Sequence, residues 1–101
     1  GKAEGFSEFY YESGQLSKKG NYKDGKAEGL WECCHENGLL KEKGNYKDGK
    51  RLGLWEEYRK NGQLLRRGNL KDDKREGLWE YFKGDGTLRK TETYKNGVKV
   101  E

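Results

Sequence analysis

The chain has 101 residues, of which 30% are hydrophobic and 40% charged, a balance typical of disordered polypeptides. An ordered fold is nevertheless indicated, because aromatic residues make up 13% of the chain, and the chain contains 16 glycines but no proline. The net charge of +4 is spread over 22 basic and 18 acidic residues, which indicates a solvated surface and gives no reason to expect nucleic-acid binding. No apolar run approaches the roughly 20 residues that cross a bilayer.

The sequence repeats itself every 24 residues without a gap. The four copies are residues 5–28, 29–52, 53–76 and 77–100. Self-similarity at such a period marks an array in which each unit packs against neighbours that resemble it. We therefore treat residues 1–101 as a single repeat domain.

Each copy contains two turn signals about 12 residues apart. The first is Ser13-Gly14, Asn37-Gly38, Asn61-Gly62 or Asp85-Gly86, and the second is Asp24-Gly25, Asp48-Gly49 or Asn96-Gly97. Asn-Gly and Asp-Gly suit two-residue type I′ turns, in which both central residues have positive φ. The pattern predicts an all-β fold, a single-layer, elongated antiparallel meander of about eight strands.

The length of the first turn decides which side chains face each other. A two-residue turn sets Glu32 against Lys43, whereas a three-residue turn with a glycine bulge opposes Glu32 and Glu42. We prefer the first register because opposite charges stabilise a sheet. The same register sets Glu8 against Lys19, Glu56 against Arg67, and Trp31 against Gly44.

Tryptophan and glycine are predicted to repeat together because a ring can cover a bare glycine in a strand. In the preferred register Trp55 covers Gly68, whereas Trp79 faces Glu92. We therefore expect Trp55 to contribute more stability than Trp79.

The register also assigns the side chains to the two faces of the sheet. One face is expected to carry Trp31, Trp55, Trp79, Leu16, Leu40, Leu64, Leu88, Tyr22, Tyr46 and Tyr94. The other face is expected to carry Phe6, Leu30, Leu54, Leu78, Tyr10, Tyr58 and Phe82.

A single sheet cannot hide both faces, and contiguous exposed apolar surface usually marks a contact. Tyr and Trp also dominate binding energy at interfaces. The candidate residues for binding a protein partner are Trp31, Trp55, Trp79, Tyr22, Tyr46 and Tyr94. The alternative, that the rings only cover glycine backbone and join adjacent strands, remains open.

The second turns concentrate the net positive charge along one edge of the sheet. The candidate residues for anionic lipid at this edge are Lys47, Lys50, Arg51, Lys71, Lys74 and Arg75. Each well-placed basic residue attracts an anionic membrane by about 1 kcal/mol. The alternative is a row of ordinary solvated turns.

Residues suited to catalysis are few. His35 occupies a position that Tyr11 and Arg59 fill in other copies, so we expect a solvated surface residue. Cys33 and Cys34 are adjacent, and neighbours on a strand point to opposite faces, which argues against a disulfide between them. Together with His35 they do not make a tetrahedral zinc site. We expect no enzymatic activity, no cofactor and no metal, although a reactive role for the cysteines remains open.

The residues resemble the MORN-variant repeats of bacterial proteins, related to the membrane occupation and recognition nexus motif. The resemblance is carried by Tyr10, Gly14, Leu16, Gly20, Tyr22, Asp24, Gly25 and Gly29 in the first copy, by Gly38, Leu40, Gly44, Tyr46, Asp48, Gly49 and Gly53 in the second, and by Tyr58, Gly62, Leu64, Gly68 and Gly77 in the third. It departs at Leu70, where a tyrosine is expected, and at Glu92, where a glycine is expected.

This resemblance implies a single-layer sheet that serves as an interaction platform. Some bacterial members carry the label of antitoxin components, so a toxin is one expected partner. Others carry a lipid-kinase label, which the residues do not support, because phosphoryl transfer requires a phosphate-binding loop and metal-binding acids around a cleft.

The ends of the array are the remaining feature. Gly1 to Glu4 match Gly25 to Glu28, so we expect a piece of a longer array. Its outer strands, 5–11 and 88–94, would leave unpaired backbone groups that recruit another chain. We therefore expect weak end-to-end self-association.

Overall fold

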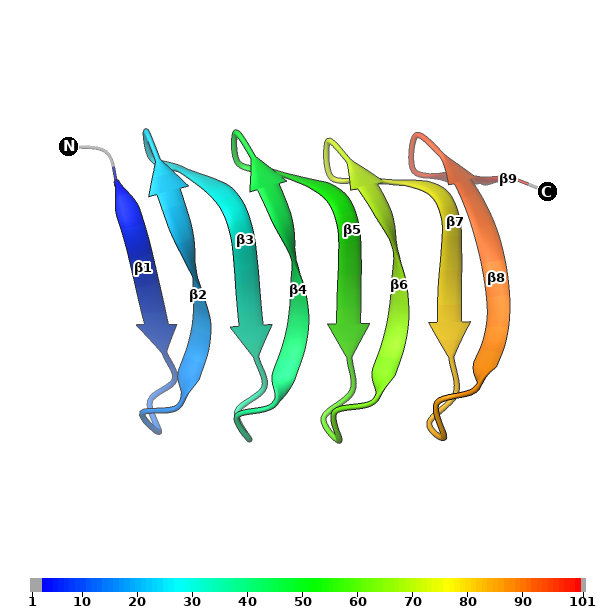
Figure 1. Cartoon of the computed structure of the whole chain (residues 1–101), viewed down its shortest axis with the longest axis horizontal. Coiled ribbons are helices and arrows are strands. Elements are labelled where there is room, and N and C mark those ends of the chain that lie inside the picture. Colours follow the sequence, from blue (N-terminus) through cyan, green and yellow to red (C-terminus); the bar gives the residue numbers. More distant parts are fainter. Residues whose placement is uncertain (1–2, 101) are drawn as a thin grey trace.

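The computed structural model describes residues 3–100 and forms one open antiparallel sheet in which every strand pairs with its neighbours in sequence (Figure 1). Gly1, Lys2 and Glu101 lie outside the described residues. The strands are β1 (Gly5–Tyr10), β2 (Leu16–Lys23), β3 (Lys26–Cys34), β4 (Leu40–Lys47), β5 (Lys50–Tyr58), β6 (Leu64–Lys71), β7 (Lys74–Phe82), β8 (Leu88–Lys95) and β9 (Val98–Val100).

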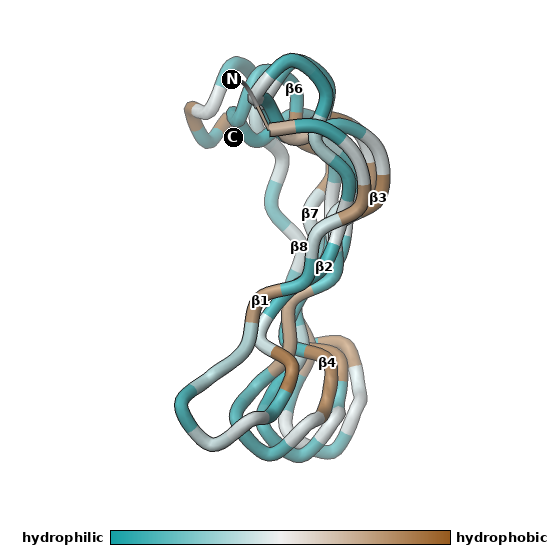
Figure 2. Tube along the Cα trace, turned by 90° about the vertical axis from the view of Figure 1, so that its left-hand side faces the viewer, coloured by the Kyte–Doolittle hydropathy of each residue, from teal (hydrophilic) through white to brown (hydrophobic). Residues whose placement is uncertain are grey.

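The described residues contain no helix, and the sheet measures 46 × 30 × 15 Å. Viewed along the row of repeats, the strands superimpose into one curved trace, so the array has one layer (Figure 2). This confirms the all-β, single-layer meander, with the short β9 as a ninth strand.

The turns at the upper edge of the sheet follow the prediction. Between β2 and β3 only Asp24 and Gly25 lie outside the strands, with φ of 52° and 81°. The third of these turns keeps this geometry without glycine, since Asp72 and Asp73 have φ of 50° and 66°. An aspartate tolerates the left-handed region better than most residues, which explains the replacement.

The turns at the lower edge are longer than predicted. Between β3 and β4, the Gly38 amide donates to the His35 carbonyl at 2.9 Å, and the His35 amide donates to the Leu39 carbonyl at 2.8 Å. Gly38 has φ of 91°, whereas Asn37 does not have a positive φ. The expected type I′ turn at Asn37-Gly38 is therefore wrong, and a three-residue turn with a glycine bulge takes its place.

The predicted register survives because a second irregularity compensates for the longer turn. Cys33 pairs with Glu42 but Cys34 pairs with Leu40, so one extra residue, Lys41, is inserted into β4. This bulge shifts the pairing back by one residue. The register is thus confirmed: Trp31 opposes Gly44 and Glu32 opposes Lys43.

The bulge corrects the expected faces for one set of residues. Because directly opposed residues of an antiparallel pair share a face, Leu40 lies with Cys34 and not with Trp31. The same shift occurs in the other three hairpins. The leucines placed wrongly with the tryptophans are Leu16, Leu40, Leu64 and Leu88.

The charged pairs of the sheet connect neighbouring repeats. Glu32 lies between Lys19 and Lys43 in the register, and its ion pair is with Lys19, at 3.8 Å. Lys43 pairs in the same way with Glu56 of the next repeat, at 3.7 Å. Such exposed pairs contribute little individually, so they align the strands without holding the array together.

Only four hydrophobic side chains among the described residues are buried, and all lie on one face. They are Trp31 at 4% exposed, Trp55 at 3%, Leu70 at 5% and Trp79 at 2%. We call this side of the sheet the Trp face. Leu30, Leu54 and Leu78 are about half exposed. The core is therefore a single row of indole rings.

Candidate functional site

Each indole ring of the Trp face lies flat on a glycine of the preceding strand. A Cβ atom at Gly44 would lie 2.2 Å from Cδ2 of Trp55, and the indole Nε1 of Trp55 donates to the carbonyl of Asn45 at 3.1 Å. Trp31 makes the same contacts with Gly20 and Asn21, and Trp79 makes them with Gly68 and Asn69.

The expectation that Trp55 covers Gly68 is therefore wrong, although the two residues are opposed in the register. The physical reason is a bulge between the repeats. One residue of β4, Gly44, faces three residues of β5, which include Gly53 at φ 83° and Trp55. The bent strand tips the indole back over the preceding repeat, and Trp79 covers Gly68 instead of facing Glu92.

The burial of the indoles changes the list of candidate partner-binding residues. Because Trp31, Trp55 and Trp79 are 2–4% exposed, they offer almost no surface to a partner and instead fix the shape of the face. Tyr22, Tyr46 and Tyr94 are half-buried and keep part of each ring accessible. Their role as partner-binding residues stays a prediction.

The aromatic rings of the first three repeats form a continuous row. Phe9 contacts Tyr22, whose ring centroid lies 5.1 Å from that of Trp31. Tyr46 continues the row, 6.1 Å from Trp31 and 5.3 Å from Trp55. Aromatic pairs at these distances stabilise beyond their buried area, so the face is a rigid surface.

Two adjoining hollows lie on the Trp face and share Glu42. The first, of about 300 Å³, is lined by Lys18, Tyr22, Ala27, Trp31, Cys33, Glu42 and Tyr46. The second, of about 170 Å³, is lined by Glu42, Arg51, Trp55, Glu57, Arg66, Leu70, Asp73, Arg75 and Trp79. Together they span β2 to β7, so the face offers an elongated site rather than an enclosed cavity.

Guanidinium groups occupy the second hollow, and each has partners. Arg66 donates to Glu57 through two nitrogens, and Arg51 Nε lies 3.1 Å from Asp73 Oδ1. The Arg51 backbone amide and then its guanidinium hold the pKa of Asp73 below its usual range. Arg75 Nη1 donates to the tyrosine hydroxyls of Tyr81 at 2.8 Å and Tyr94 at 3.1 Å.

Glu42 differs from these residues. Within residues 3–100 its carboxylate has no ion pair or hydrogen bond, and it stands directly opposite Glu57, whose charge Arg66 already neutralises. Burial, followed by the charge of Glu42, raises the pKa of the Cys33 thiol in the same hollow. The first hollow therefore has a carboxylate without an ion pair, although Lys18 also lines the hollow.

The upper edge carries most of the candidate lipid-binding residues. Lys47 stands directly opposite Lys50, and Lys71 opposite Lys74; all four are exposed. Such like-charged pairs are unfavourable across strands, so solvent or an anion must offset them. Arg51 and Arg75 are exceptions, because their guanidinium groups lie 5.6 and 4.8 Å from the ring centroids of Trp55 and Trp79, on the Trp face.

A hollow of about 340 Å³ accompanies these lysines. It is lined by Lys26, Lys47, Asp48, Lys50, Arg51, Leu52 and Asp72. The structure thus brings Lys47, Lys50 and Arg51 around one concave site.

The lower edge joins the repeats through one recurring position. Tyr11 donates its hydroxyl to the Cys34 carbonyl at 2.6 Å, and His35 Nε2 donates to the Tyr58 carbonyl at 2.9 Å. Arg59 donates likewise to Phe82. The expectation that His35 is a solvated surface residue is therefore wrong. The sequence contained a sign of this role, because the residues at this position in all four copies have a side chain that can donate a hydrogen bond.

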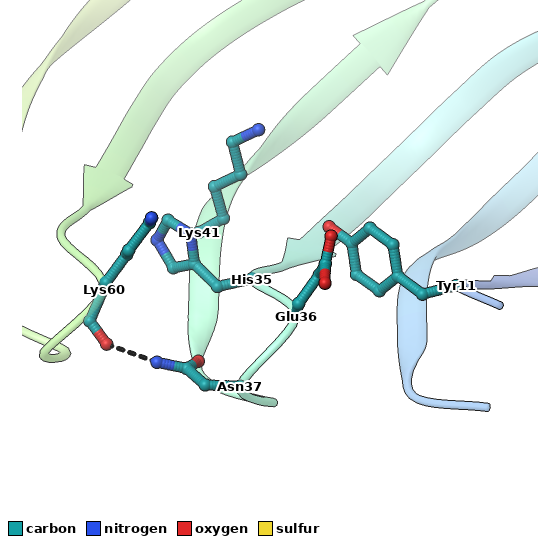
Figure 3. A pocket seen from close by; sticks show the side chains of 6 residues that line it. All are labelled: Tyr11, His35, Glu36, Asn37, Lys41 and Lys60. Atoms are coloured by element: carbon teal, nitrogen blue, oxygen red, sulfur yellow. Dashed lines mark hydrogen bonds between the residues drawn. The ribbon is translucent and has the colours of Figure 1, made fainter. Parts of the chain in front are cut away.

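A hollow of about 430 Å³ lies at this lower edge (Figure 3). It is lined by Tyr11, His35, Glu36, Asn37, Lys41 and Lys60. Asn37 donates its side-chain amide to the Lys60 carbonyl at 2.7 Å, which joins two loops. Both charge signs are present around an open rim, so the lining favours no class of ligand.

Other kinds of site find little support in the described part of the chain. No group of three or more His, Cys, Asp or Glu side chains within residues 3–100 could hold a metal ion. Cys33 and Cys34 are free thiols. None of the described residues forms a helix that could cross a membrane.

Comparison with known families agrees with the repeat boundaries. A family model described as MORN repeat variant matches four consecutive segments, residues 4–24, 27–48, 51–72 and 75–96. No curated protein matches the chain.

Proposed function

Because the chain belongs to the MORN repeat variant family, we propose that it is a non-catalytic scaffold that binds a protein partner on its Trp face. Repeats of this family are commonly interaction or membrane-binding modules and are generally not enzymes. The observation that carries the proposal is the pair of adjoining hollows on the Trp face, whose shared residue Glu42 forms no ion pair or hydrogen bond within residues 3–100.

The physical form of this face supports binding. Its buried indoles are held by hydrogen bonds to the preceding repeat, so the surface is ordered before a partner arrives and little conformational entropy is lost on association. The half-buried Tyr22 and Tyr46 flank the first hollow. Tyrosine contributes large contact area with few rotatable bonds, which makes it frequent among residues that dominate binding.

A site-specific photo-cross-linking experiment tests the location. A photoreactive phenylalanine derivative is placed at Tyr46, and in a matched control at Leu54, which is 52% exposed on the opposite face. In the native cell, irradiation should give a covalent adduct with one protein from position 46 and none from position 54. Adducts of equal yield from both positions, or none from position 46, would remove the Trp face as the binding surface.

The antitoxin-type role and the bacterial origin that the resemblance implies belong to this proposal. The captured partner would then be a protein that arrests growth when it is expressed without this chain. Growth that continues would remove the toxin as partner and leave the scaffold.

A second candidate is a membrane-surface module, favoured by the opposed lysine pairs of the upper edge. Vesicles containing phosphatidylserine should then pellet the chain at low salt and release it at high salt, because screening weakens exposed charges. Replacing Lys47 and Lys50 by glutamine should abolish pelleting, whereas the same change at Lys41 and Lys60 on the lower edge should not. No pelleting at low salt would eliminate this candidate.

A further inference from the structure

One position of the repeat differs in a way that bears on the first hollow. The equivalent residues in the four copies are Ala27, Arg51, Arg75 and Lys99. Arg51 Cζ lies 5.6 Å from the ring centroid of Trp55, and Arg75 Cζ lies 4.8 Å from that of Trp79. In the second and third copies, the array therefore supplies its own guanidinium to the Trp face.

In the first copy this group is absent, because alanine has no side chain beyond Cβ. The first hollow, which Ala27 lines, is larger than the second, which Arg51 and Arg75 occupy, at about 300 Å³ against about 170 Å³. Trp31 lines the first hollow and corresponds to Trp55 and Trp79. The first hollow thus corresponds to the sites beside Trp55 and Trp79, except that it has no arginine side chain in it.

The charges around the first hollow favour a cation. Glu42 has no ion pair or hydrogen bond among the described residues, because Arg66 pairs with the opposed Glu57 instead, so the Glu42 carboxylate can still accept hydrogen bonds from a positive group. Lys18 also lines the hollow, but its Nζ lies 4.8 Å from the centroid of the Phe9 ring. Lys18 is therefore already engaged with another aromatic ring.

The rings around the hollow favour a guanidinium over an ammonium. Tyr22 and Tyr46 meet Trp31 edge to face, with interplanar angles of 76° and 78°. A planar, weakly hydrated guanidinium stacks on aromatic rings and donates hydrogen bonds to a carboxylate at the same time, which an ammonium does less well.

We propose that the first hollow binds the guanidinium of an arginine side chain of the partner protein, between the rings of Tyr22 and Tyr46 and the carboxylate of Glu42. This inference rests on the proposed function, since it names the chemical group that the Trp face recognises.

Nuclear magnetic resonance of the purified full chain tests this directly. The probe is N-acetyl-arginine amide, and its neutral analogue of the same shape is N-acetyl-citrulline amide. The arginine probe should cause saturable shifts of the Trp31 indole N–H and the Ala27 amide up to about 100 mM, as expected for millimolar binding of a small fragment. The citrulline probe should cause none, and N-acetyl-lysine amide should bind more weakly than the arginine probe.

Three variants make the test specific. Ala27→Arg should fold, because two other copies carry arginine there, and should abolish the shifts by filling the hollow from within. Glu42→Gln should weaken binding about tenfold, since it removes the charged acceptor. Glu36→Gln, an exposed change on the lower edge, should leave binding unchanged.

Several results would overturn the proposal. These are equal shifts with citrulline, equal affinity for lysine and arginine probes, unaltered binding in folded Ala27→Arg, or equal effects of the two glutamine variants. The absence of a saturable shift at Trp31 would do so as well. If the titration fails while the cross-link at position 46 succeeds, only the arginine inference falls; the reverse result removes the proposed function.

Discussion

The contact between indole and glycine predicts that a single methyl group will destabilise the array. In Gly44→Ala the new Cβ would lie 2.2 and 2.3 Å from Cδ2 and Cε2 of Trp55, far inside van der Waals contact. The ring cannot move away without weakening the hydrogen bond from its Nε1 to the Asn45 carbonyl. The substitution therefore forces either strain in β4 or displacement of the buried indole.

The expected loss of stability follows from two effects. Overpacking costs about 1 to 3 kcal/mol, and a weakened hydrogen bond costs up to about 1.5 kcal/mol. Replacing glycine in a strand returns about 0.5 to 1 kcal/mol, because the unfolded chain loses freedom. The net loss should be about 2 kcal/mol, which for a domain of this size lowers Tm by about 8 to 16 °C.

Thermal and urea unfolding, followed by circular dichroism and tryptophan fluorescence, measure the effect. Gly84→Ala is the matched control, because its Cβ would meet no heavy atom within 4 Å and its φ is not positive. The control should be neutral or slightly stabilised. The double variant Gly44→Ala/Trp55→Ala should lose less than the sum of the two single losses, since removing the ring relieves the clash. A Gly44→Ala loss within about 0.5 kcal/mol of the control, or strict additivity, would refute the reasoning.

Trp79→Ala should destabilise the fold as much as Trp55→Ala, by about 3 kcal/mol each, because both rings cover a glycine. A loss of stability for Trp79→Ala that is less than half the loss for Trp55→Ala, measured by thermal unfolding, would contradict this. Hydrogen bonds from Lys99 and Tyr94 hold the pKa of Glu92 at about 2 instead of 4.5. This lowered pKa stabilises the fold above about pH 4.5, and the contribution is lost as pH falls toward about 2; a carbon-13 titration with its midpoint near 4.5 would exclude it. The expected outer strand 88–94 is partly covered, because the short β9 pairs with residues 93–95 of β8. The free edge of β1 and residues 88–92 of β8 still lack a partner strand, so sedimentation should detect weak end-to-end association; a strict monomer at about 1 mM would show that the charges at these edges prevent it.

The period, the strand order and the register follow from the sequence because they depend on features that recur at fixed spacing. Turn residues mark each reversal, and opposite charges such as Glu32 and Lys43 favour one alignment over its neighbour. The predicted register is correct although the predicted two-residue turn at the lower edge is wrong. A two-residue turn without a bulge and a three-residue turn followed by a bulge at Lys41 give the same residue pairs. The sequence does not distinguish between these two arrangements.

The direction of the indoles could not be predicted because it depends on a bulge between repeats. The register fixes the backbone residue opposite Trp55, but the bend at Gly53 decides over which strand the ring lies. The sequence contained one clue, since the last tryptophan, Trp79, has a glycine at the preceding position, Gly68, and a glutamate at the opposed one, Glu92. Glycine is needed only at the position that the indole ring covers, because a Cβ atom there would clash with the ring.

Each repeat contacts the next at the lower edge, in the middle and at the upper edge of the sheet. These contacts help to explain the positions at which the repeats differ. At the lower edge His35 donates to the next repeat, in the middle Trp55 covers Gly44, and at the upper edge Glu28 accepts from the Asp48 amide at 3.2 Å. Glu92 departs from glycine where no indole of the described residues covers it. Ala27 stands where the next two copies carry arginine, in β3, which has a paired strand on either side. A partner arginine in the first hollow, as proposed above, would supply the guanidinium that Ala27 lacks.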